Sequence, residues 1–301
     1  MDLAIYLTYI GIYLGTYLYI PCLSLALLTS SSLSPSSPQN PSFVSTIATM
    51  KESQTVLYAT ETLGQRVTEY SEAKSLELPK HLTDYHADIV KTQPGTSHYM
   101  ISTFQSQALV WLARLMGAKR VLEIGVYLGY SSMVWSHAVG PAGQVTGLEF
   151  NAEYADKARA AFAKHGVGNC EIITGPALEQ IPLLTPSEPY DVIFIDAKKS
   201  EYPGYLSAIL DRSSPASSSS SRLLRAGGLI VADNALRRGL VATATDRLDQ
   251  GAAALLPRSE YSSDEDVERL AEYNEAVRAC PRLEAFLCPL WDGVNLARLV
   301  D

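Results

Sequence analysis

The sequence predicts an α/β fold with a doubly wound, mostly parallel seven-stranded sheet that ends in an antiparallel C-terminal hairpin. Three observations support this prediction. Five short apolar segments between Arg120 and Ala232 alternate with helix-like segments, which is typical of a parallel sheet covered on both faces. Asp292-Gly293 is a turn signal between two final strand-like segments. The chain of 301 residues, 47% of them hydrophobic, is long and apolar enough to bury a large core.

Each element follows from a local pattern. From about Thr55 the apolar spacing is helical, with Leu63, Val67 and Tyr70 on one face, and a second amphipathic helix is expected over 102–116. The parallel strands are predicted where short runs are rich in β-branched residues, at 120–124, 144–149, 170–174, 191–195 and 228–232. We therefore expect one large domain over residues 55–301.

The N-terminal segment differs from the rest of the chain. Residues 3–28 carry no charged side chain and are long enough to span a membrane. They predict either a membrane anchor or an extension that precedes a true start at Met50. A signal peptide is disfavoured, because the basic n-region is missing and the apolar run is too long. Residues 29–54 are rich in Ser, Thr and Pro and are expected to form a linker. If the segment is an anchor, Lys51 and the large domain face the cytoplasm.

Charge and cysteine content exclude several classes of protein. The chain has 24 Lys and Arg against 32 Asp and Glu, a formal net charge of −8, which disfavours nucleic acid as a partner. The four cysteines form no CxxC pair, so neither a zinc cluster nor a disulfide framework is expected. This cysteine usage suits a reducing, cytoplasmic location.

One half of the expected sheet carries a nucleoside-binding pattern. A strand runs into a turn at Gly125, a helix begins near Tyr130 or Ser131, and Glu149 ends the next strand, where a carboxylate can accept both ribose hydroxyls. Gly125 and Gly129 do not complete a GxGxxG pattern, which argues against a dinucleotide site. An NAD-dependent oxidoreductase nevertheless shares the strand, turn and acidic residue and is kept as an alternative. A plain tight turn at Gly125 is the structural alternative.

Two acidic clusters follow two further strands. Asp196 ends one strand, and Asp233 with Asn234 ends another. Because the carboxyl ends of parallel strands form the ligand crevice, three oxygen ligands there suit a hard cation such as Mg²⁺. The alternative is that both aspartates are helix N-caps. Lys198 and Lys199 follow Asp196 closely.

Taken together, these motifs resemble the cation-dependent class I O-methyltransferases of the caffeoyl-CoA and catechol type. The similarity covers residues 55–301 and is carried by the stretches LEIGVYLGYS (122–131), GLEFNAEYADKAR (147–159), GPALEQIP (175–182), YDVIFIDAKKSEYPGY (190–205), LLRAGGLIVADN (223–234) and PLWDGVNLARL (289–299). The resemblance implies a Rossmann-like sheet, S-adenosylmethionine as methyl donor, a divalent cation and a homodimer.

The resemblance also assigns roles to individual residues. It implies a metal site at Asp196, Asp233 and Asn234, and a catalytic role for Asp196 and for Lys199, which occupies the position of the base. Lys198, an acidic or aromatic position in many relatives, is expected to be solvated. The residues implied in cofactor binding are Glu123, Gly125, Tyr130, Ser131, Glu149, Ala177 and Asp196.

The sequence therefore predicts an enzyme that transfers a methyl group to a hydroxyl of a catechol-like or hydroxycinnamoyl-CoA-like phenolic acceptor. A phenol with a pKa near 10 is mostly protonated at neutral pH, and chelation of two neighbouring hydroxyls by Mg²⁺ would activate it. A membrane-tethered, non-catalytic binding protein is the remaining alternative. Residues 97–107 lack the acidic residue that many relatives carry, so the acceptor is not identified. Trp291 is expected in the core or in the acceptor pocket, and the five histidines are assigned no role.

Overall fold

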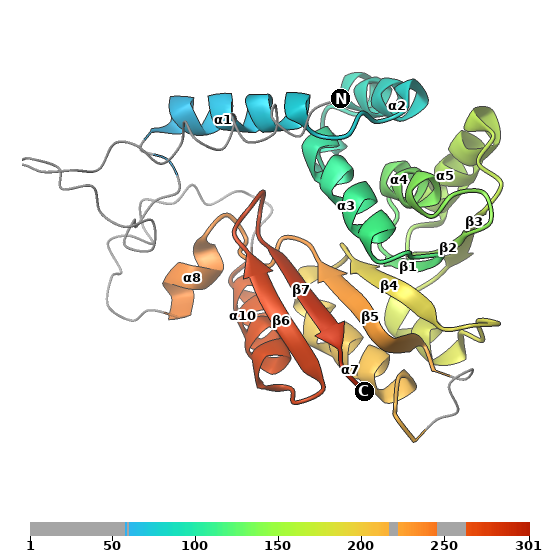
Figure 1. Ribbon diagram of the computed structural model, residues 1–301, viewed down its shortest axis with the longest axis vertical. Coiled ribbons are helices and arrows are strands. Elements are labelled where there is room, and N and C mark those ends of the chain that lie inside the picture. The colour runs from blue at the N-terminus through green and yellow to red at the C-terminus, as the bar shows by residue number, and fades with distance from the viewer. Residues whose placement is uncertain (1–57, 59, 217–221, 246–262) are drawn as a thin grey trace, which may run out of the picture. The chain divides into compact units, whose positions relative to one another are not determined.

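A computed structural model describes residues 58, 60–216, 222–245 and 263–301 (Figure 1). All of them fall in one compact unit, which extends from Val56 to Asp301. The predicted anchor at 1–28 and linker at 29–54 lie outside the described residues and stay predictions. None of the helices in the described ranges is long and apolar enough to cross a membrane.

The strands form one seven-stranded sheet in the order β3-β2-β1-β4-β5-β7-β6. The first five strands pair in parallel, and β7 runs antiparallel to both β5 and β6. This arrangement confirms the predicted fold class. The strands are β1 (Arg120–Ile124), β2 (Gln144–Glu149), β3 (Cys170–Thr174), β4 (Tyr190–Ile195), β5 (Leu224–Ala232), β6 (Leu283–Cys288) and β7 (Val294–Leu299).

Helices cover both faces of the sheet (Figure 1). The side chains of α2, α3, α4 and α5 pack on one face, and those of α6, α7, α8 and α10 on the other. Their bounds are α1 (Glu61–Lys74), α2 (Lys80–Thr92), α3 (Thr103–Leu115), α4 (Tyr130–Val139), α5 (Ala152–His165), α6 (Ala177–Gln180), α7 (Tyr202–Arg212), α8 (Leu240–Thr245) and α10 (Asp264–Ala279).

The two apolar layers follow from the two-residue period of a strand. In β4, Val192 and Phe194 belong to the core under α3 and α4, whereas Ile193 and Ile195 belong to the core under α7 and α10. Because successive side chains point to opposite faces, a strand buried on both sides must be apolar at every position. This requirement explains the continuous apolar runs in the sequence.

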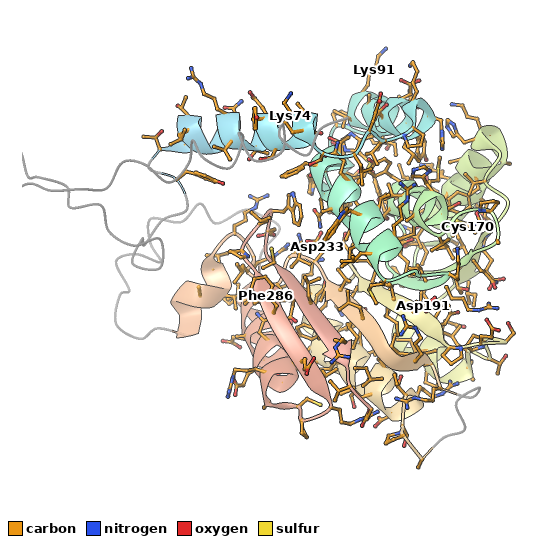
Figure 2. All side chains as sticks on the ribbon, viewed as in Figure 1. Lys74, Lys91, Cys170, Asp191, Asp233 and Phe286 are labelled. Atoms are coloured by element: carbon orange, nitrogen blue, oxygen red, sulfur yellow. The ribbon has the colours of Figure 1, made fainter. Side chains whose placement is uncertain are left out.

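The sheet brings the chemically active residues to one edge. Ile124, Ile195 and Ala232 end β1, β4 and β5 and are partners in register across the three neighbouring strands. The ladder continues one residue further, since the Asp196 N–H donates to Ile124 O and the Asp233 N–H donates to Ile195 O, each at 2.9 Å. Asp233 thus lies at the end of the sheet opposite to Asp191, near the start of β4 (Figure 2).

Some boundaries differ from the predictions. β5 begins at Leu224 rather than at residue 228, because its first residues already pair with β4 at Tyr190. The helix predicted near residue 55 is described as α1, but it buries no side chain, and Leu63 and Tyr70 are 44% and 67% exposed. The spacing predicted the helix correctly but not a buried face.

The close approach at Gly125 yields a stability prediction. Gly125 has φ +94°, and a Cβ there would lie 2.2 Å from the backbone oxygen of Asp196. We expect Gly125→Ala to lower the free energy of unfolding by about 3 kcal/mol or more, because the substitution adds a backbone clash to the strain of a positive φ. Urea denaturation followed by circular dichroism measures this loss.

The control is Gly166→Ala, at the end of α5. Gly166 also has a positive φ, of +69°, but nothing lies within 4 Å of its added Cβ. The expected loss is about 1 kcal/mol, the strain alone. Equal losses for the two variants would show that the contact with Asp196 carries no cost.

Candidate active site

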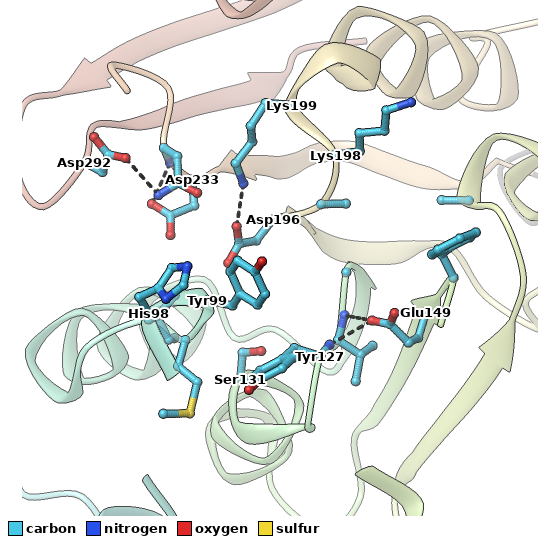
Figure 3. A pocket seen from close by; sticks show the side chains of 18 of the residues that line it. His98, Tyr99, Tyr127, Ser131, Glu149, Asp196, Lys198, Lys199, Asp233 and Asp292 are labelled. Atoms are coloured by element: carbon cyan, nitrogen blue, oxygen red, sulfur yellow. Dashed lines mark hydrogen bonds and ion pairs between the residues drawn. The ribbon is translucent and has the colours of Figure 1, made fainter. Parts of the chain in front are cut away.

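A cavity of about 970 Å³ opens at the carboxyl ends of the central strands (Figure 3). This volume suits a nucleoside-sized ligand together with a small second molecule. The predicted site residues that line it are Gly125, Tyr130, Ser131, Glu149, Ala177, Asp196, Lys199, Asp233 and Asn234. The structure thus brings together all of the predicted site residues except Glu123.

Glu149 marks one end of the cavity. Its Oε2 accepts hydrogen bonds from the backbone N–H groups of Val126 and Tyr127 at 3.0 and 2.8 Å, and its Oε1 accepts one from Asn151 at 2.8 Å. The turn after Gly125 therefore wraps around the carboxylate, with Tyr127 at φ +52°. These three hydrogen bonds leave one of the four carboxylate lone pairs unused, on Oε1, and this lone pair can accept a hydrogen bond from a ribose hydroxyl.

The start of α4 forms the floor beside this carboxylate. Ser131 lines the cavity directly, in the first turn of the helix (Figure 3). Tyr130 is only 1% exposed, and its hydroxyl oxygen accepts a hydrogen bond from Ser106 at 3.0 Å. Its ring is thereby fixed between α3 and α4, where it supports the cavity wall. The N-terminus of α4 therefore borders the cavity, where its backbone N–H groups can bind an anionic group.

Glu123 lies behind the cavity and does not line it. Its side chain is completely buried, Ser132 donates a hydrogen bond to its Oε2, and its Oε1 has no partner among the described residues. Burial raises the pKa of Glu123 to about 8, the hydroxyls of Ser131 and Ser132 oppose this rise, and the charge of Asp196 adds to it. The structure thus places Glu123 against the first turn of α4 rather than in the position expected for cofactor contact.

The opposite end of the cavity is acidic. Asp233 is 3% exposed, and its Oδ1 accepts a hydrogen bond from the Asn234 N–H at 2.8 Å. Burial, and next the charge of Asp196, raise the pKa of Asp233 to about 7. The alternative that both aspartates are helix N-caps is wrong: Lys198 and Glu201 precede the two helical segments after Asp196, and α8 begins seven residues after Asp233.

This donor set fits a divalent cation. The carboxylates of Asp196 and Asp233 and the amide oxygen of Asn234 are hard ligands, and a cation beside them would favour the ionised form of Asp233, which the charge of Asp196 disfavours. Within the described ranges no group of three or more His, Cys, Asp and Glu side chains is arranged to hold a metal ion. A cation here would therefore rely on the amide of Asn234 as its third protein ligand.

The two adjacent lysines occupy different environments. The side chain of Lys199 is 10% exposed and donates to Asp196 Oδ1 at 2.8 Å and to the Tyr202 hydroxyl at 3.0 Å. The Tyr202 hydroxyl, with its single proton, in turn lies between two backbone oxygens, that of Ile195 at 3.2 Å and that of Asp233, the residue after β5, at 3.0 Å. The side chain of Lys198 is 68% exposed and pairs with Glu201 at 3.0 Å. Of the two, only Lys199 is held against the acidic end of the cavity.

Several lining residues carried no signal in the sequence. His98, Tyr99 and Tyr127 line the cavity from the segment before α3 and from the Gly125 turn. Trp291, which the sequence placed in the core or in the acceptor pocket, also lines the cavity, and its ring lies 5.8 Å from that of Phe104, so it serves both the pocket and the packing. Asp292, beside it in the β6–β7 turn, reaches the cavity as well. No spacing rule connects these residues, because they come from separate loops.

The family model of the O-methyltransferases matches residues 72–300. The chain belongs to the O-methyltransferase family. It is 33% identical over 237 residues to O-methyltransferase ankF of Aspergillus thermomutatus, covering 77% of this chain and 92% of the relative. Caffeoyl-CoA O-methyltransferase 5 of Nicotiana tabacum is 32% identical over 204 residues, covering 66% of this chain and 76% of the relative.

A solved structure agrees with this membership. The SAH-bound methyltransferase PaMTH1 of Podospora anserina superposes with a TM-score of 0.68 and 29% identity, covering 82% of this chain and all of the other. The prediction of an S-adenosylmethionine-dependent O-methyltransferase is thereby confirmed. The alternatives of an NAD-dependent oxidoreductase and of a non-catalytic tethered protein find no support.

Glu123 yields a pH prediction for stability. Its pKa is about 8 in the folded chain against 4.5 for the unconstrained group, so between these values the folded state binds more protons than the unfolded state. The contribution of Glu123 to the free energy of unfolding therefore falls as the pH rises through this interval. Glu123→Gln should lessen the loss of stability between pH 5 and pH 8 by about 1 kcal/mol or more.

The measurement is urea denaturation at several pH values. Glu153→Gln, on the exposed surface of α5, is the matched control and should keep the wild-type profile. A profile of Glu123→Gln that runs parallel to that of the wild type would contradict the prediction.

Proposed function

We propose that this enzyme transfers the methyl group of S-adenosylmethionine to one of two neighbouring phenolic hydroxyls, with a divalent cation held by Asp196, Asp233 and Asn234. One observation carries the proposal: the carboxylate of Glu149 and the acidic strand ends face the same cavity. A donor and a metal-chelated acceptor bound at these two ends would meet over Gly125, between them. Such positioning alone can supply on the order of 7–11 kcal/mol of a barrier.

The residues at the Glu149 end would bind the donor. Glu149 offers the remaining lone pair of Oε1 to the ribose hydroxyls, and Ala177 at the start of α6 leaves room beside them for the adenine. Gly125, without a side chain, lets the ligand approach the turn and the N-terminus of α4. When bound, S-adenosylmethionine supplies a methyl group on a cationic sulfonium. Asp196 and Glu149 add negative charge to the cavity that receives this cation.

The residues at the acidic end would hold the cation and the acceptor. When bound, Mg²⁺ supplies Lewis acidity that favours ionisation of a phenol. Asp196 and Asp233 hold it through carboxylates and Asn234 through its amide oxygen. Lys199 Nζ lies 2.8 Å from Asp196 Oδ1, and in its neutral amine form it can take the proton of a hydroxyl bound at this end. The buried hydroxyl of Tyr202 fixes that amine in place.

The acceptor class follows from the cation. A single hydroxyl occupies one coordination position, whereas two neighbouring hydroxyls occupy two, so chelation selects a vicinal diol. Caffeoyl-CoA O-methyltransferases are among the relatives of this chain, and we propose a catechol-like or hydroxycinnamoyl-type acceptor. The homodimer and the absence of a nucleic-acid partner stay predictions.

A methyl-transfer assay with and without metal tests the proposal. With a vicinal diphenol and Mg²⁺, we expect turnover that falls about 100-fold or more in excess EDTA and returns on addition of Mg²⁺, because the cation contributes several kcal/mol. The matching monophenol should react far more slowly. Calorimetry with S-adenosylhomocysteine reports donor binding separately. An unchanged rate in excess EDTA would exclude the cation from the reaction.

The two lysines test the proton transfer. Lys199→Ala should lower kcat about 100-fold or more, because it removes both the base and the partner of Asp196. Lys198→Ala removes an exposed ion pair, which contributes little, and should lower kcat much less. Rates measured under saturating donor and acceptor decide between them. A larger loss for Lys198→Ala would assign the proton transfer to the other lysine.

A further inference from the structure

Asp292, in the turn between β6 and β7, holds the loop that follows β5. Its Oδ2 accepts a hydrogen bond from the side-chain Nδ2 of Asn234 at 3.2 Å, which is the dashed line that ends at Asp292 in Figure 3. Its Oδ1 accepts one from the backbone N–H of Arg238. The backbone joins the same two segments, since the Leu236 N–H donates to Asp292 O at 3.0 Å and the Ala235 N–H donates to Gly293 O at 2.9 Å.

The approach of the two segments depends on a glycine. Gly293 has φ +80°, and a Cβ there would lie 2.4 Å from the side chain of Leu236. Any larger residue would move the turn away from the loop. Asn234 itself has φ +56°, a conformation that asparagine tolerates better than most residues. The contact between Asp292 and Asn234 is therefore fixed by the backbone on both sides.

This contact decides the orientation of the Asn234 amide. A carboxylate only accepts hydrogen bonds, so the nitrogen of the amide must face Asp292. The amide oxygen is bonded to the same carbon and must then point away from Asp292. An asparagine ligates a hard cation through its oxygen and never through its protonated nitrogen. With the amide reversed, Asn234 would present N–H groups to the cation.

We infer that Asp292 is a positioning residue: by holding the Asn234 nitrogen, it makes the Asn234 oxygen available as the third ligand beside Asp196 and Asp233. The inference rests on the proposed function, since it concerns the same cation. Groups that orient a metal ligand in this way commonly change metal affinity 10- to 100-fold when they are removed. Asp292 itself needs no contact with the cation or with the acceptor.

Exchange of the two side chains tests this inference. Asp292→Asn replaces two acceptor oxygens with one oxygen and one NH₂ group. The single oxygen cannot accept from both the Asn234 amide and the Arg238 N–H as the carboxylate does, so the Asn234 amide loses its fixed orientation. In Asn234→Asp, two carboxylates face each other where the wild type has a hydrogen bond. In the double variant, the new amide nitrogen at position 292 can donate to the new carboxylate at position 234, and its oxygen can still accept from the Arg238 N–H.

The measurement is the affinity for Mn²⁺ alone, by electron paramagnetic resonance, without donor or acceptor. We expect Asp292→Asn to weaken Mn²⁺ binding about 10-fold or more in the wild-type background. The same substitution should strengthen Mn²⁺ binding in the Asn234→Asp background. If Asp292 only supported the loop, Asp292→Asn would change the Mn²⁺ affinity in the same direction in both backgrounds. Glu284→Gln, an exposed carboxylate of β6 paired with Arg298, is the control in the same hairpin.

The outcomes separate the two proposals. If the wild type binds Mn²⁺ and Asp292→Asn changes the affinity in the same direction in both backgrounds, the positioning role is overturned while the cation site stands. If the wild type binds no Mn²⁺, the cation site of the proposed function is overturned, and the positioning role with it. Thermal unfolding of each variant shows whether it is folded. The sign reversal in folded variants supports the inference.

Discussion

The backbone ladder across the ends of β1, β4 and β5 is the interaction on which the site depends. Ile124, Ile195 and Ala232 lie in register, and the N–H groups of Asp196 and Asp233 extend the ladder by one residue. Residues more than 70 positions apart in the sequence are thereby held at neighbouring positions of one sheet edge. Parallel pairing places every carboxyl end on the same side, and the apolar layers on both faces fix the register.

The same edge concentrates negative charge in a buried place. Asp233 is almost inaccessible and lies near Asp196, an arrangement that costs free energy in the chain alone because neither carboxylate is fully hydrated. Lys199 offsets part of this cost through its ion pair with Asp196. Buried ionisable side chains that lower the stability of the fold in this way are frequent at functional sites. Here they lie beside the cavity in which an O-methyltransferase must bring donor and acceptor together.

The turn of the C-terminal hairpin, between β6 and β7, forms one wall of the cavity. β7 pairs antiparallel with β5, so the β6–β7 turn returns to the carboxyl end of β5. Trp291 and Asp292 of that turn line the cavity next to Asn234. An antiparallel edge on a parallel sheet therefore does more than close the fold, because it brings a carboxylate against the amide that follows Asp233.

Local sequence patterns were enough to predict the strands, their alternation with helices in a mostly parallel sheet, and most of the site residues. Apolar runs mark doubly buried strands, and Gly125, Glu149, Asp196 and Asp233 follow strand ends, where local pattern and general topology are enough. The remaining features follow from contacts that form when the chain folds. The burial of Glu123 behind the cavity depends on the packing of the layers, and the hydrogen bond between Asp292 and Asn234 joins residues 58 positions apart in the sequence. The spacing of apolar residues predicts which face of a strand or helix a side chain lies on. How deeply that side chain is buried, and which distant residue it contacts, depends on how the helices pack on the sheet.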